Sequence, residues 1–223
     1  MRSKNNLLSW AAFCKAVKSA GENTSEIRSI IEKLDFYEKD IELADINRVN
    51  ARYRLAKEIK YIEYDSYSKL VADAYTALFK AFLTYTVFER YMKLLTGENS
   101  TRAILKKPNP LYPDGQKSLA TTLNNLRNSK RFFEFVKDKL NRPKSGMETD
   151  AEKEMRYYLE GNEFQPIAIM AAVRHVFAHG KLTPSANKSY PKNTTKILNI
   201  LTESILEAID NDFSERVGNL KST

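Results

Sequence analysis

The sequence is poor in the residues that build disulfide and metal frameworks. Its 223 residues include one cysteine, Cys14, and two histidines. A single thiol cannot form a disulfide within the chain, and it cannot supply the cysteine pairs of a structural zinc site. A lone thiol is typical of a reducing compartment, so we expect a cytoplasmic protein.

Chain-breaking residues and long apolar runs are also scarce. Seven glycines and seven prolines leave long uninterrupted stretches, which favours helices over a sheet protein with its many turns. No apolar run approaches the roughly 20 residues needed to cross a bilayer, so we expect no membrane partner. Lys15 and Lys18 interrupt the apolar patch near the N-terminus, which therefore fits an amphipathic helix better than a signal peptide.

Apolar residues recur at helical spacing along most of the chain. We expect an all-α fold, with an up-and-down bundle of four to five helices over residues 63–223 and an N-terminal helical extension or arm over residues 1–62. With 42% hydrophobic residues, the chain can bury a substantial core. The expected helices span residues 6–19, 23–59, 66–95, 118–140, 151–159, 166–180 and 197–217, and the proline-rich residues 97–117 are expected to form a loop.

Positive charge is concentrated in one part of the chain. The formal net charge is +8, and residues 97–150 hold eleven Lys and Arg against six Asp and Glu, which accounts for +5 of it. Such a segment is typical of a surface that faces a polyanion. A solvated helix face is the alternative.

The stretch AAVRHVFAHG, residues 171–180, places Arg174 and both histidines among apolar residues. His175 and His179 are four residues apart and share a helix face, as helical zinc ligands do, and Glu89 is the only third ligand that we consider. Because no third histidine or cysteine pair exists, the sequence favours satisfied core histidines over a metal, and we expect none. Arg174 and His179 are roughly 140° apart around an ideal helix, so the arginine must reach around it, or a second subunit must complete a site.

Glu89 lies on the apolar stripe of the helix expected at residues 66–95, four residues after Tyr85. A carboxylate there needs a partner, and an arginine on a facing helix is the strongest one available. Glu89 can instead extend its carboxylate to solvent or pair with Lys93.

The sequence IMAAVRHVFAHGKL resembles the motif of the HEPN superfamily, in which an Arg, a polar residue and then a His lie on one bundle helix. Here these residues are Arg174, His175 and His179, and the frequent Ala-His-Gly ending is present. His175 stands where many members carry Asn or Asp. The resemblance covers roughly residues 66–217, and it implies a HEPN-like helical bundle that forms a homodimer.

Many HEPN proteins are metal-independent endoribonucleases, so the resemblance implies cleavage of RNA without a cofactor. A base takes the proton of the ribose 2′-OH, this oxygen attacks the adjacent phosphate, and an acid protonates the leaving oxygen. His179 suits either proton transfer, and Arg174 would stabilise the charge that develops on the phosphate. A second subunit, or His175 within the chain, would supply the other proton transfer. HEPN proteins often carry an acidic residue near this Arg and His, which would be Glu89.

The basic segment supplies candidate RNA-binding residues, which are Lys106, Lys107, Arg127, Lys130 and Arg131. Tyr112, Phe132 and Phe135 are candidates for base stacking, although core packing is the favoured interpretation of the two phenylalanines.

We expect a toxin or phage-defence ribonuclease held in check by an antitoxin or another regulatory protein. A noncatalytic HEPN-like module that binds RNA or a nucleotide is the first alternative. A helical protein-interaction scaffold is the second.

Overall fold

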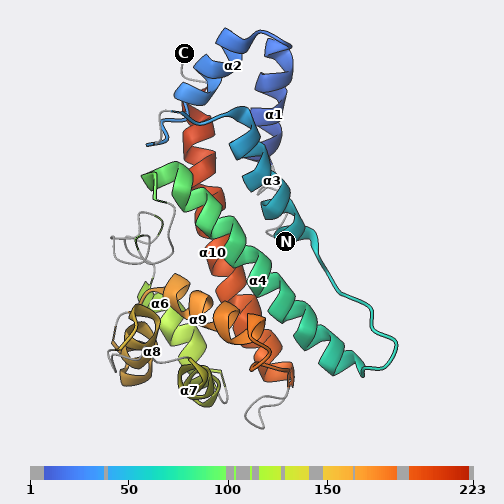
Figure 1. The fold of residues 1–223 in the computed structure, drawn as a ribbon, viewed down its shortest axis with the longest axis vertical. Coiled ribbons are helices and arrows are strands. Elements are labelled where there is room, and N and C mark those ends of the chain that lie inside the picture. Colours follow the sequence, from blue (N-terminus) through green and yellow to red (C-terminus); the bar gives the residue numbers. More distant parts are fainter. Residues whose placement is uncertain are drawn as a thin grey trace.

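The computed structural model describes residues 8–37, 40–98, 103, 111, 116–126, 129–140, 148–162, 164–184 and 191–220. Within these ranges all regular structure is helical, which confirms the expected all-α bundle. Two long helices, α4 (Lys69–Thr96) and α10 (Pro191–Asn219), cross at the middle of the molecule (Figure 1). No helix in the described ranges is both long enough and apolar enough to cross a bilayer.

Helix α4 confirms the element expected at residues 66–95. Its apolar residues follow the helical repeat, and it ends at Gly97, which adopts the left-handed conformation with φ of 70°. The expected loop at residues 97–117 lies mostly outside the described residues. Helix α10 packs along α4 and buries a stripe of isoleucine, leucine, phenylalanine and valine side chains, namely Ile197, Leu198, Leu201, Ile205, Leu206, Ile209, Phe213 and Val217.

The N-terminal helices belong to the same core. Helices α1 (Leu8–Ala20) and α3 (Leu43–Glu58) pack against α10 and α4, around the C-terminal end of α10 (Figure 1). The Trp10 ring of α1 stacks on Phe213 with 3.6 Å between ring centroids, and Tyr53 of α3 stacks on Trp10 at 5.4 Å. Helices α1 and α3 of this N-terminal extension are therefore packed onto the bundle.

The single helix expected over residues 23–59 is wrong, because the chain forms α2 (Thr24–Glu32) and α3 with a turn between them. Asn23 caps α2 through a side chain that accepts from the Glu26 amide, as its position suggests. Leu34 turns into the core, and Asp35 has a φ of 52°, which ends the helical path. A capping box between Glu42 and Asp45 then starts α3.

Arg216 of α10 holds this turn in place. Its guanidinium donates to the carbonyl oxygens of Leu34 and Asp35 at 3.0 and 2.5 Å. It also pairs with Asp212 at 2.8 Å and lies 5.0 Å from the centroid of the Phe36 ring. Backbone carbonyls left unpaired by the end of α2 are thus satisfied by a side chain from the last helix.

The helix expected over residues 118–140 is likewise divided, into α6 (Gln116–Asn124) and α7 (Ser129–Lys139). Asn124 and Asn125 precede the break, and asparagine favours turns because its side chain competes for backbone hydrogen bonds. Ser129 then begins α7 in a buried position, where its hydroxyl accepts from the Tyr158 hydroxyl at 3.2 Å.

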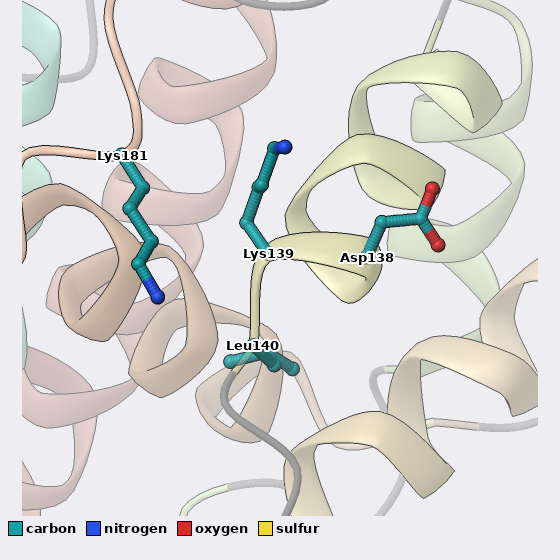
Figure 2. Close-up of a pocket in the computed structure, with 4 residues that line it drawn as sticks. All are labelled: Asp138, Lys139, Leu140 and Lys181. Carbon is teal, nitrogen blue, oxygen red and sulfur yellow. The ribbon is translucent and has the colours of Figure 1, made fainter.

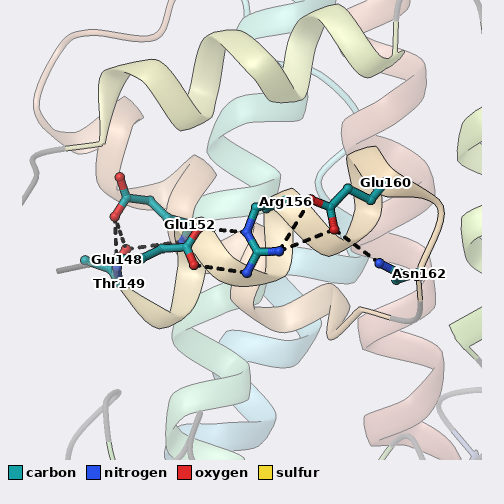
Figure 3. Close-up of polar contacts among 6 residues, drawn as sticks. All are labelled: Glu148, Thr149, Glu152, Arg156, Glu160 and Asn162. Carbon is teal, nitrogen blue, oxygen red and sulfur yellow. Dashed lines mark hydrogen bonds and ion pairs between the residues drawn. The ribbon is translucent and has the colours of Figure 1, made fainter.

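Helix α8 (Asp150–Glu160) matches the element expected at residues 151–159 and orients the next helix. Thr149 and Glu152 form a capping box, and Arg156 lies between Glu148 and Glu160 and pairs with both (Figure 3). From the same helix, the carboxylate of Glu154 accepts from the backbone N–H of Gln165 at 2.6 Å. This bond fixes the start of α9 (Pro166–Ala178), which begins at Pro166 as expected.

One carboxylate is buried where α1, α3 and α10 meet. Asp210 is only 4% exposed, and burial raises its pKa to about 6, although Tyr53, Lys57 and Trp10 lower it in part. The Trp10 indole N–H and the Tyr53 hydroxyl are the donors near this carboxylate, and neither forms a hydrogen bond of good geometry with its Oδ1 atom. Ionised Asp210 therefore destabilises the fold.

We predict that Asp210→Asn stabilises the protein above pH 6. A carboxyl whose pKa rises from 3.8 to about 6 on folding contributes stability that is complete below pH 3.8 and lost as the pH rises through 6. The substitution removes this loss, so we expect a gain of about 1 to 3 kcal/mol in the free energy of unfolding at pH 7.5 and little change at pH 4. Urea unfolding at both pH values measures it.

Asp212→Asn is the matched control. It weakens the ion pair with Arg216, so it should destabilise at pH 7.5. A loss of stability in Asp210→Asn at pH 7.5 would contradict the prediction.

Candidate functional site

The candidate site lies at the C-terminal end of α9. This helix buries one face, with Ile167, Ile169, Met170, Val173 and Val176 in the core. The apolar residues are continuous until Val173, and Arg174 and His175 lie on the half-buried side that follows. The polar groups of the motif therefore lie at the edge of the core.

The Ala-His-Gly ending is a helix-stop motif. His179 is the C-cap, and Gly180 follows with a φ of 69°, which suits a residue without a side chain. The Gly180 N–H donates to the Phe177 carbonyl at 2.9 Å, and the Lys181 N–H donates to the Val176 carbonyl at 3.0 Å. This bond pattern is the Schellman motif, and it places His179 at the negative end of the helix dipole.

The two histidines are in contact. Their ring centroids are 4.5 Å apart, with 62° between the ring planes. His175 is half-buried and His179 is exposed. Burial lowers the pKa of His175, and the positive charges of His179, Lys181 and Arg174 lower it further. His175 is therefore a neutral imidazole at neutral pH, held against a second, solvent-facing one.

Arg174 points toward α4. Its guanidinium lies 5.5 Å from the centroid of the Tyr85 ring and 5.8 Å from that of Phe82, within cation–π range. The Nε atom is buried and has no hydrogen-bond partner within the described structure. Arg174 and His179 thus lie on different sides of α9, as the helical spacing predicts.

Glu89 occupies the same face of α4 as the aromatic rings that contact Arg174. It lies one turn beyond Tyr85 and is half-buried. The placement agrees with a carboxylate at the edge of the apolar stripe. Its pairing with Arg174 stays a prediction.

A hollow of about 460 Å³ lies beside the end of α9, lined by Asp138, Lys139, Leu140 and Lys181. Lys139 and Lys181 lie on its two sides, while the Asp138 carboxylate points away from both (Figure 2). Lys181 is close enough to lower the pKa of His175, so the hollow and the histidines form one cationic region.

The two lysines of the hollow were not among the sequence candidates. Lys181 directly follows the Ala-His-Gly ending, and a cation just after a helix end is a usable signal. Lys139 is in the last turn of α7, and only the packing of α7 against α9 brings it near.

The candidate RNA-binding residues are only partly described. Lys130 and Arg131 are exposed on α7, whereas Lys106, Lys107 and Arg127 lie outside the described residues. Phe132 is buried and Phe135 packs against the core, which confirms core packing for both, and Tyr112 lies outside the described part of the chain. In the described ranges, no three His, Cys, Asp or Glu side chains gather as a metal site would require.

Comparison with protein-family models, with curated proteins and with solved structures finds no match to this chain. The functional assignment must therefore come from the site itself. The site is a contacting histidine pair at a capped helix end, with Lys139 and Lys181 beside it and Arg174 on another side of the helix. Such a site can hold a phosphate and move a proton near neutral pH.

We predict that the pKa of His175 rises when a neighbouring cation is removed. In His179→Ala and in Lys181→Met the imidazolium form of His175 loses a repulsive neighbour, so its titration should move to higher pH. NMR titration of the imidazole resonances measures this shift. Lys18→Met, at an exposed position on α1, is the control and should leave the titration unchanged. An unchanged titration in both site variants would show that these charges do not act on His175.

Proposed function

We propose that this protein is a metal-independent endoribonuclease that cleaves RNA through attack of the ribose 2′-OH on the adjacent phosphate. The observation that carries the proposal is the contacting pair of His175 and His179 at a cationic helix end. RNA supplies its own nucleophile, so the protein has to provide only proton transfer and charge stabilisation. The resemblance of the stretch around Arg174 to the HEPN motif supports the same reaction.

His179 is the residue that we assign to proton transfer. It is exposed, and it lies beside the lysine-lined hollow that can receive a phosphate. His175 is half-buried behind it and touches its ring, so His175 acts as a positioning residue that fixes the His179 imidazole.

The contact between the two rings argues for a second subunit. In an in-line reaction the attacking and leaving oxygens lie on opposite sides of the phosphorus, each within about 2.7 Å of its own proton-transfer group. Rings whose centroids are 4.5 Å apart leave no room for a phosphate between them. A symmetric homodimer would place a His179 imidazole from each subunit on either side of the phosphate.

Basic residues around the site would hold the RNA backbone. Lys139 and Lys181 face the hollow, and Lys130 and Arg131 are exposed at the other end of α7. Contacts of this kind bind phosphates without regard to sequence, and they weaken as salt releases the counterions. A toxin or phage-defence role, with an antitoxin partner that covers this region, fits such a ribonuclease.

One observation favours a noncatalytic module as the second candidate. The Arg174 guanidinium stacks on Phe82 and Tyr85, and its Nε atom is buried. An arginine held in this way can fix α9 on α4 without touching a substrate. In that case the histidines and lysines would bind RNA without cutting it.

We predict that purified wild-type protein cleaves RNA in excess EDTA and leaves 2′,3′-cyclic phosphate ends. His179→Ala should lower the rate by about 10² to 10⁴, the usual contribution of a proton-transfer group. The ends of labelled tRNA and mRNA fragments measure the reaction. Lys18→Met on α1, at the opposite end of the bundle, should cleave like wild type (Figure 1). RNA binding without cleavage would favour the noncatalytic module.

A mixing experiment tests the shared site. If each site needs His179 from both subunits, a tenfold excess of His179→Ala protein traps wild-type chains in dead heterodimers and lowers their activity by about tenfold. RNA is kept in excess over total protein, so that competition for substrate does not contribute. Activity that does not change on mixing would place the complete site within one chain.

A further inference from the structure

A second cationic cleft lies where α3, α4 and α10 meet, away from α9. Its volume is about 420 Å³, within the size range of small-ligand pockets. Three lysines line the cleft: Lys57 from α3, Lys80 from α4, and Lys60 from the segment after α3. The full lining is Lys57, Ile59, Lys60, Asp73, Thr76, Ala77, Lys80, Thr195, Asn199 and Glu203. Thr76 and Ala77 are buried and form its floor.

Lys57 and Lys80 are the central feature of this cleft. Both are half-buried, and the positive charge of Lys57 acts directly on Lys80. Burial lowers the pKa of Lys80, Glu203 opposes that change, and Lys57 adds to it. Two like charges held near each other and partly withdrawn from water destabilise a protein unless an anion joins them.

The carboxylates of the described chain do not pair with these two lysines. The ion pairs among described residues leave out both Lys57 and Lys80, and Asp73 binds Lys69 at 2.8 Å. Glu203 is exposed and acts on Lys80 from beyond ion-pair distance. The buried Asp210 is near enough to Lys57 for the lysine to lower its pKa, but burial keeps that pKa raised.

The remaining polar groups show which ligand the cleft suits. The hydroxyls of Thr76 and Thr195 donate to backbone carbonyls at 2.9 and 3.0 Å, so their protons are already used. Lysine ammonium groups and the Asn199 amide are left as donors. Several donors around one small space match a compact anion with several acceptor oxygens.

We propose that this cleft binds a small phosphate-bearing ligand between Lys57 and Lys80, as a site separate from the histidine pair. A polymer fits less well, because Asp73 and Glu203 at the cleft would repel a continuous phosphate backbone. A single phosphate or pyrophosphate group needs contact with the lysines alone, so these carboxylates oppose it less than they oppose a polymer.

The cost of keeping two half-buried lysines together distinguishes a binding role from a structural one. If Lys80 supports the fold, its replacement by methionine should lower the melting temperature. If it is kept for a ligand, Lys80→Met removes a half-buried charge and keeps the apolar stem, so the ligand-free protein should melt at the same or a higher temperature.

The test titrates the full chain with pyrophosphate, with sodium chloride adjusted to hold the ionic strength constant. We expect a saturable rise in melting temperature and saturable heat by calorimetry. Lys80→Met and Lys57→Met should weaken binding by at least tenfold, whereas Lys80→Arg should keep most of it. The control Lys18→Met should respond like wild type. ADP and ribose 5-phosphate, titrated in the same way, distinguish a nucleotide from a sugar phosphate as the natural source of the phosphate.

Two results would overturn the proposal. One is a wild-type protein that shows no saturable response to pyrophosphate, ADP or ribose 5-phosphate. The other is a Lys80→Met protein that binds these ligands as tightly as wild type does, whatever its melting temperature. Loss of short single-stranded RNA binding in Lys80→Met, with no pyrophosphate response in wild type, would assign the cleft to RNA instead.

Discussion

The packing of α4 against α10 is the interaction on which the rest of the structure depends. Each helix is long enough to meet different partners at its two ends, so α1 and α3 cover one half of the pair while α7 and α9 cover the other. Fully burying one leucine or isoleucine contributes about 1.5 to 3 kcal/mol, and α10 alone buries six of them. The same interface also buries the hydroxyls of Thr84 and Thr202 without partners in the described structure, while the Tyr91 hydroxyl of α4 donates to the Asp212 carboxylate of α10 at 2.5 Å. Apolar contact therefore makes up most of this interface, and a hydrogen bond at one end supplements it.

This packing also sets the chemistry at the end of α9. The Phe177 ring meets Phe79 of α4 edge-on at 5.4 Å, and Arg174 lies on the next two aromatic rings of the same helix. Helix α4 therefore fixes the rotation of α9, and this rotation turns His175 partly inward and His179 outward. The lowered pKa of His175 follows from its place at the edge of the core, where burial disfavours the charged imidazole.

Local sequence signals predicted the elements whose causes are local. The periodicity and Gly97 locate α4, Pro166 locates the start of α9, and the Ala-His-Gly ending locates its end. The turn between α2 and α3 is held by Arg216, which lies more than 180 residues along the chain, and no local pattern predicts this contact. The candidate sites follow the same rule. Arg174, His175 and His179 lie in one short stretch and could be found from the sequence. The place of Lys139, and the cleft of Lys57 and Lys80, depend on the packing of distant helices.

The contact of Ser9 with Ser214 and that of Arg216 with Leu34 join segments from opposite ends of the sequence. During translation, α1 and α3 leave the ribosome long before α10, which supplies Phe213 and the stripe that covers α4. The histidine motif is also synthesised before α10, by a few seconds at about 5 to 20 residues per second. At that stage the nascent chain contains α9, which carries the motif, and α4, against which α9 packs. It still lacks α10, the main packing partner of α4. The folded site is therefore completed only after α10 has been synthesised.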